Sequence, residues 1–81
     1  MKVPRDVSAD KLVKGLIKLG YSITRQKGSH IRLTLESDNK THHITIPNHN
    51  PIKIGTLNNI INDLAAFHKI EKHEMISTLF N

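Results

Sequence analysis

The stretch that decides the fold is YSITRQKGSHIRLTL, residues 21–35. Apolar and polar residues alternate on both sides of Lys27-Gly28, which predicts two antiparallel strands joined by a tight turn at these two residues. The period of two places Tyr21, Ile23 and Arg25 on one side of the first strand. The segment therefore predicts a β-hairpin, and the rest of the chain can be read outward from it.

In the second strand the aliphatic residues face a core, while His30 and Arg32 share the opposite, open face. Turn-forming residues then lead to a third strand from Thr41 to Ile46, which ends at Pro47 and carries His43 on the open face. The aliphatic residues expected to point inward are Ile31, Leu33, Leu35, Ile44 and Ile46.

Helical periodicity flanks these strands on both sides. Ser8 is a good N-cap for a first helix that Gly20 ends. Its lysines form a stripe that is either a solvated face or a surface facing phosphate. A second amphipathic helix begins in the segment Ile54–Leu57, and a short last helix covers about Glu71 to Phe80. The lysines of the stripe are Lys11, Lys14 and Lys18.

Residues 1–81 are thus predicted to form one α+β domain with a three-stranded antiparallel sheet and helices on one face of it. The expected order is α-β-β-β-α plus a short C-terminal helix. The other face of the sheet stays open to a ligand.

Charge and composition narrow the class of partner. The net charge is +5, from 12 Lys+Arg against 7 Asp+Glu, and seven of those cations lie in residues 1–27. This convergence on the histidine-bearing turn favours a polyanion, RNA first. Cysteine is absent, no run is apolar enough to span a membrane, and no Walker or dinucleotide motif occurs. We therefore expect a soluble cytoplasmic protein with no nucleotide cofactor.

The block RQKGSH, residues 25–30, carries the groups that suit a phosphodiester. Its two cations can neutralise phosphate charge, and the imidazole of His30 can carry a proton in either direction near neutral pH. Ser29 binds phosphate or shapes the turn. Lys53, beside a helix start that presents backbone N–H groups, either contacts phosphate or only flanks a capped helix. The predicted RNA-binding set is Arg25, Lys27, Gly28, Ser29, Arg32, His43 and Lys53, with His43 divided evenly between RNA contact and simple surface polarity.

The other histidines need their own interpretation. By parity His42 points inward, so we expect a half-buried residue at the strand end, and His49 is either a loop residue or part of the site. His68 and His73 are expected to be ordinary surface residues. The adjacent pair His42-His43 points in opposite directions on a strand, and no Cys or HExxH pair completes a tetrahedron, so no metal site is predicted.

Four segments together resemble a known family over roughly residues 8–66. They are Gly20-Tyr21, the block of residues 25–30, Ile44-Thr45-Ile46-Pro47 followed by His49, and Gly55-Thr56-Leu57. The chain resembles the HicA-type (YcfA-like) mRNA interferase toxins. The resemblance implies a double-stranded-RNA-binding-domain-like fold, ribosome-independent cleavage of mRNA, neutralisation by a HicB-type antitoxin, and catalysis by the histidine of the Gly-Ser-His block, here His30.

The residues limit how such a cut would be made. Hydrolysis by metal-activated water usually needs clustered carboxylates, and the acids here are scattered along the chain, which favours cleavage without a metal. We expect His30 to take the 2′-hydroxyl proton, while Arg25, Lys27 and Arg32 stabilise the developing charge. The second proton carrier is His43, His49 or water. The alternative function is a non-catalytic RNA-binding module of the same fold that uses His30 only as a contact.

Overall fold

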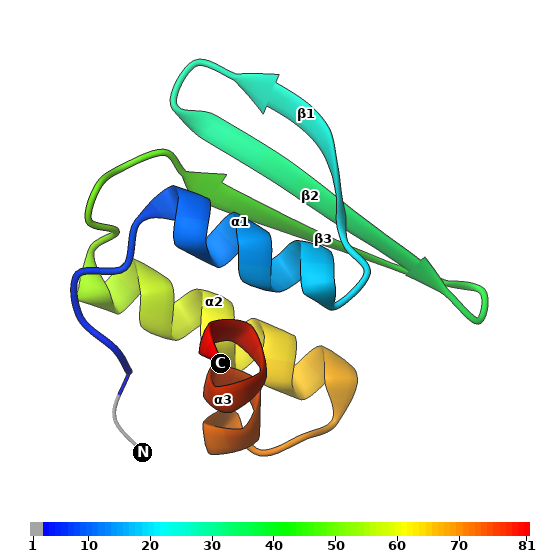
Figure 1. Ribbon diagram of the computed structural model, residues 1–81. Helices are drawn as coiled ribbons and strands as arrows, with labels where there is room; N and C mark the ends of the chain where they lie inside the picture. The colour runs from blue at the N-terminus through cyan, green and yellow to red at the C-terminus, as the bar shows by residue number, and fades with distance from the viewer. Residues whose placement is uncertain (1–2) are drawn as a thin grey trace.

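The computed structural model describes residues 3–81 and confirms the predicted order of elements (Figure 1). Three strands follow one helix and precede two more, so the class is α+β with the order α-β-β-β-α-α. The elements are α1 (Ala9–Lys18), β1 (Ser22–Lys27), β2 (His30–Ser37), β3 (Lys40–Pro47), α2 (Ile54–His68) and α3 (Lys72–Phe80).

The three strands form one antiparallel sheet in the order β1-β2-β3. The first hairpin closes on the pair Lys27 and His30, so the turn consists of Gly28 and Ser29. Gly28 has a φ of 58°, the left-handed conformation that the first central residue of a type II′ hairpin turn requires. The turn predicted at Lys27-Gly28 is therefore one residue too early, because Lys27 is still paired in β1.

A β-bulge in β1 changes which residues share a face. Ile23 pairs with Leu33, but the next pair along the ladder is Arg25 with Arg32, so Thr24 is the extra residue. A bulge inserts one residue and reverses the alternation beyond it. Arg25 therefore lies on the open face with Arg32, and the prediction that it shares a side with Ile23 was wrong.

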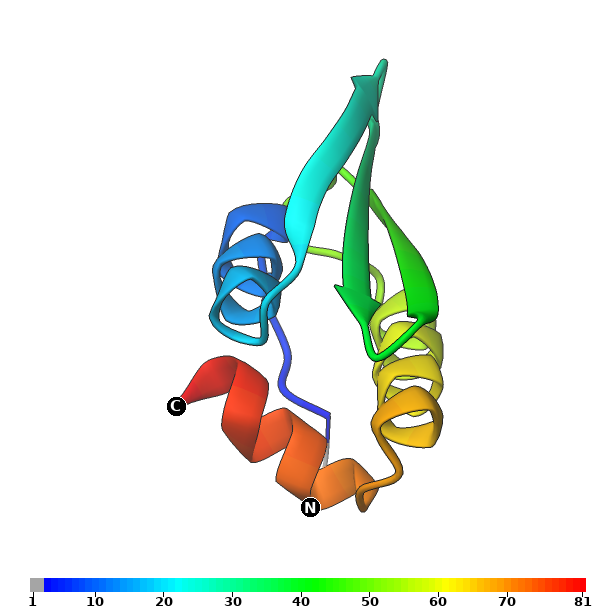
Figure 2. The same ribbon diagram turned by 90° about the vertical axis from the view of Figure 1, so that its right-hand side faces the viewer.

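The helices lie on one side of the sheet, and α3 forms a further layer (Figure 2). Figure 2 shows α1 and α2 beneath the sheet, with α3 packed across these two helices at the far end. Gly15 of α1 is buried, and a Cβ added there would lie 2.5 Å from the carbonyl oxygen of Leu79 in α3. The backbones of α1 and α3 are thus in direct contact at this glycine.

Local signals in the sequence set the ends of α1. The side chain of Ser8 accepts a hydrogen bond from the backbone N–H of Lys11, and Gly20, with a φ of 106°, follows the end of the helix. Lys11 and Lys18 of the lysine stripe are directed toward the end of α3. Lys18 Nζ donates to the carbonyl oxygen of Asn81, and Lys11 Nζ lies 5.9 Å from the ring centre of Phe80. This places these two lysines on the helical side of the molecule.

The core between the sheet and the helices is aliphatic, and among residues 3–81 Tyr21 is the one buried aromatic residue. Among residues 3–81, no buried residue is charged, and none carries a side-chain amide or a Ser or Thr hydroxyl. No helix in that range is long and apolar enough to cross a membrane. The inward-pointing residues of β2 and β3 include Ile31, Leu33, Ile44 and Ile46, all of them buried as predicted.

Candidate nucleic-acid interface

A basic hollow lies on the face of the sheet that the helices leave uncovered. Its volume is about 250 Å³, and all three strands contribute to its lining. Four of the lining residues were predicted to act on RNA from the sequence. The lining consists of Arg25 and Lys27 from β1, His30 and Arg32 from β2, and Thr45 from β3.

The strand register brings these residues together. Arg25 lies opposite Arg32 in the antiparallel ladder, and Lys27 lies opposite His30. Side chains directly opposite each other share one face, with Cβ atoms about 4.5–5.5 Å apart. Thr45 is the β3 partner of Arg32, so it completes the floor of the hollow. The bulge at Thr24 is essential to this arrangement because it turns Arg25 onto the open face.

Three cationic side chains, Arg25, Lys27 and Arg32, gather in this hollow. Like charges directly opposite each other in a sheet are destabilising. Within residues 3–81, none of the three cations of the hollow forms an ion pair with a carboxylate. The hollow is thus an electropositive concavity in which a bound anion would relieve repulsion between Arg25 and Arg32.

The turn beside the hollow presents an accessible backbone. Ser29 is exposed, and a Cβ built on Gly28 would meet no heavy atom within 4 Å. The backbone N–H of Asn48 donates to the carbonyl oxygen of Ser29 at 2.5 Å, which ties the segment after β3 to this turn. His49 is exposed and lies two residues after Pro47, the residue opposite His30, so it is at the same end of the sheet.

Gly28 and Ser29 form the turn beside the hollow, and two other predicted RNA-binding residues lie well away from it. His43 is on the open face as expected, but it pairs with Thr34, four residues beyond His30 in β2. At about 3.3 Å per residue, this places it roughly 13 Å along the strand. Lys53 lies at the start of α2 and lines a separate hollow of about 250 Å³ that also includes Arg5 and Asp6. The structure therefore brings together four of the predicted side chains and leaves these two apart.

Tyr21 joins two histidines from distant parts of the chain on the inner side of the sheet. Its hydroxyl lies 2.6 Å from Nδ1 of His42 and 3.0 Å from Nε2 of His68. His42 Nε2 lies 3.2 Å from a carboxylate oxygen of Asp63, and its ring stacks on Phe67 with centroids 4.2 Å apart. If Asp63 accepts from Nε2–H, then Nδ1 of His42 accepts from the tyrosine hydroxyl, and His68 Nε2–H donates to the tyrosine oxygen.

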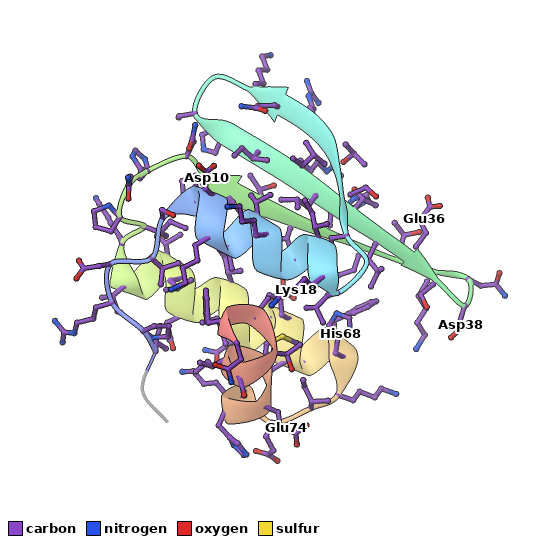
Figure 3. The ribbon with its side chains drawn as sticks, viewed as in Figure 1. Asp10, Lys18, Glu36, Asp38, His68 and Glu74 are labelled. Carbon is purple, nitrogen blue, oxygen red and sulfur yellow. The ribbon has the colours of Figure 1, made fainter. Side chains whose placement is uncertain are left out.

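The network corrects one prediction and confirms another. The side chain of His42 is 11% exposed, as expected for a half-buried residue at the strand end. His68, expected to be an ordinary surface residue, instead lies at the end of α2 and points toward the sheet (Figure 3). No local signal identifies this contact, since Tyr21 and His68 are 47 residues apart. His73 is exposed on α3, as expected.

The network also changes the pKa values of Tyr21 and His68. Burial, with a smaller contribution from the charge of Asp63, raises the pKa of Tyr21 to about 12. Burial, reinforced by the neighbouring His42, lowers the pKa of His68 below its ordinary value. Both shifts favour the neutral side chain, which suits a hydrogen-bonded cluster that stabilises the fold. In the part of the chain from residue 3 onward, no three His, Asp or Glu side chains gather closely enough to hold a metal ion.

Comparison with known proteins gives one match. Residues 9–65 match the family model described as the HicA toxin of bacterial toxin-antitoxin systems. The matched range begins with α1 and ends within α2, so it includes every residue of the basic hollow. No curated protein and no solved structure matches the chain.

Proposed function

Because the chain belongs to the HicA toxin family of bacterial toxin–antitoxin systems, we propose that it is an mRNA interferase that cuts RNA in the hollow around His30. One observation carries this proposal. Three cations without acidic partners in residues 3–81 surround a histidine on the uncovered face of the sheet. A phosphodiester supplies the negative charge that this arrangement lacks, and an imidazole is the side chain best suited to move a proton at neutral pH.

In the proposed reaction His30 accepts the proton of a ribose 2′-hydroxyl. The freed oxygen attacks the adjacent phosphorus, and the bond from phosphorus to the 5′ oxygen of the next nucleotide breaks. The products are a 2′,3′-cyclic phosphate and a 5′-hydroxyl end. Arg25, Lys27 and Arg32 stabilise the extra negative charge that the non-bridging oxygens carry in the transition state. The proposed step uses no metal, because the lining of the hollow has cationic side chains and contains no carboxylate that could hold a metal ion.

The leaving 5′ oxygen also needs a proton. The sheet register supports His49 over His43 for this role, because His49 lies two residues after Pro47, the residue opposite His30, whereas His43 is hydrogen-bonded to Thr34 farther along the sheet. Water remains the alternative donor. A His49→Ala variant distinguishes His49 from water as the donor. If His49 is the general acid, the cleavage rate falls by about 10²–10⁴-fold, and if water is the donor, the rate does not change.

We further propose that a HicB-type antitoxin neutralises the protein by covering the open face. Occluding the basic hollow would block RNA from His30, and an acidic surface on the partner would complement the unpaired cations. A complex in which RNA still reaches His30 would contradict this.

The first experiment compares the wild type with His30→Ala on long single-stranded RNA in EDTA, measuring cleavage, product ends and RNA affinity. His73→Ala is the matched control, because His73 is an exposed histidine on α3, away from the sheet. We expect His30→Ala to lose about 10²–10⁴-fold in cleavage rate while it retains RNA binding. His73→Ala should behave as the wild type.

The product ends and the affinity decide between the alternatives. Products that end in a 2′,3′-cyclic phosphate, or in the 3′-phosphate formed from it, support attack by the 2′ oxygen. Cleavage that stops in EDTA would contradict the metal-free step. Binding of RNA by both proteins without any cleavage would favour the non-catalytic module and remove the assignment as a ribonuclease.

A further inference from the structure

The open face of β2 changes character along its length. Its alternate residues are His30, Arg32, Thr34 and Glu36, so the row runs from basic to uncharged to acidic side chains. His30 and Arg32 line the basic hollow, whereas the other two residues do not. Figure 3 shows Glu36 at the far end of the strand, projecting away from the three helices. The face therefore has a second, chemically different region beyond the basic hollow.

Hydrogen bonds across the three strands organise the middle of this face. Thr24 Oγ1 lies 2.8 Å from Thr34 Oγ1, which in turn lies 2.8 Å from Nδ1 of His43. Thr24 Oγ1 also donates to the carbonyl oxygen of Arg32 at 3.4 Å. Thr24 takes part because it is the bulged residue of β1, and bulges commonly re-aim side chains next to functional sites. The row is a set of fixed polar groups and not a set of freely rotating surface side chains.

A second hollow adjoins this row. Its volume is about 320 Å³, and hydroxyl groups and one carboxylate supply its side-chain chemistry, with no cation in the lining. Thr34 lies two residues from Arg32, so the two hollows are about 7 Å apart along the strand. The residues that line the second hollow are Gly20, Ser22, Thr24, Thr34 and Glu36.

We propose that this second hollow reads the nucleobase next to the phosphate that is cut. The proposal rests on the proposed function and adds a specificity site to it. A second phosphate does not suit the hollow, because the carboxylate of Glu36 would repel it. A nucleobase is neutral and carries polar edges that hydroxyls and carboxylates bind, and single-stranded RNA can splay such a base away from its neighbours.

The chemistry of the lining also selects among bases. An ionised carboxylate only accepts hydrogen bonds. The threonine hydroxyls also offer a base acceptor positions only, because Thr24 donates its proton to the carbonyl oxygen of Arg32 and Thr34 then donates its proton to Thr24. Glu36 therefore favours a base that presents an amino group, which adenine, cytosine and guanine have and uracil lacks. Uracil offers only one donor, its N3–H, and this lies between two carbonyl oxygens that the carboxylate repels. The hollow is thus a site that favours amino-bearing bases over uracil.

The test compares Glu36→Gln with the wild type on a pool of RNA of random sequence, with the base composition beside each cut read by sequencing. Glutamine keeps the shape but adds a donor, so it can pair with the carbonyl oxygens of uracil. We expect the wild type to disfavour uracil by about tenfold at one position beside the cut, and Glu36→Gln to remove that preference. Glu74→Gln on α3 is the matched control and should keep the wild-type preference.

Affinity provides a readout that does not depend on cleavage. Oligonucleotides that carry a 2′-deoxy sugar at every position cannot undergo attack by a 2′ oxygen. Their phosphates are the same whatever the base, so differences in affinity between oligomers of different bases report on base recognition. Stronger wild-type binding to oligomers with amino-bearing bases than to oligo-uracil, equalised by Glu36→Gln, supports the proposal even if the wild type cuts no RNA.

Three results would overturn the inference. One is equal treatment of uracil and the other bases by the wild type in both assays. Another is a preference that Glu36→Gln and Glu74→Gln leave equally intact. The third is a Glu36→Gln variant that loses antitoxin binding with its base preference unchanged, which would assign the hollow to the protein interface.

Discussion

Replacing Gly15 with alanine should separate two helices, although the same change in an isolated helix would stabilise it. The new Cβ would lie 2.5 Å from the carbonyl oxygen of Leu79 and 3.2 Å from its Cα. These are backbone atoms of α3, so no side-chain rotation can make room. Carbon and oxygen atoms in weak contacts approach to about 3.3 Å, so α3 must retreat by about 0.8 Å.

The change in the free energy of unfolding caused by Gly15→Ala follows from two opposing effects. Alanine gains about 1 kcal/mol over glycine inside a helix. Overpacking a buried contact costs about 1–3 kcal/mol, and a gap of this width also forfeits a quarter to a half of the dispersion energy at the separated surfaces. The residues that α3 buries are Met75, Ile76 and Leu79. We expect Gly15→Ala to lower the free energy of unfolding by about 1–2 kcal/mol and Tm by about 4–16 °C.

Urea unfolding followed by circular dichroism measures this, with Gly55→Ala as the control. Gly55 lies in α2 with no heavy atom within 4 Å of an added Cβ, so alanine there should raise the free energy of unfolding by about 0.4–1 kcal/mol. Both variants are best made in the His30→Ala background, because the proposed function predicts that this change removes toxicity to the host. If Gly15→Ala proves as stable as Gly55→Ala, the contact between α1 and α3 is not the close one described.

Two further predictions concern the cluster around Tyr21. Tyr21→Phe leaves His42 and His68 without the hydroxyl that joins them, so urea unfolding should show a loss of about 1–3 kcal/mol; an unchanged midpoint would mean that water replaces the hydroxyl. The stability should also depend on pH in two windows. Because the pKa of His68 is lowered on folding, its contribution is complete above its unfolded pKa and is lost as the pH falls through the folded pKa. Because the pKa of Tyr21 rises from 10.0 to about 12, its contribution is complete below pH 10 and is lost as the pH rises toward 12. Unfolding midpoints at about pH 5, 7.5 and 11 test both windows, and a midpoint independent of pH would contradict them.

The order of elements and the buried faces could be predicted because they depend on short-range periodicity. A strand with one buried face places an apolar residue at every second position, and Ile31, Leu33, Ile44 and Ile46 follow that rule. No such pattern in the sequence predicts the bulge at Thr24. The segment around it continues to alternate in sequence, and only its pairing with β2 shows that Arg25 faces outward.

The basic hollow could be foreseen in part because its residues lie close together along the chain. Arg25, Lys27, His30 and Arg32 belong to one hairpin, so a tight turn is enough to bring them side by side. Thr45 joins them only through the register of β3, and His43 is kept out of the hollow by the same register.

The sequence by itself determined the hairpin, the three helices and the identity of the charged residues at the turn, because each depends on neighbours a few positions away. Only the tertiary structure decided that Gly15 meets Leu79 and that Tyr21 joins His42 to His68. These contacts depend on how separate elements pack, and packing is set by the shape of the whole core, which no local pattern of residues encodes.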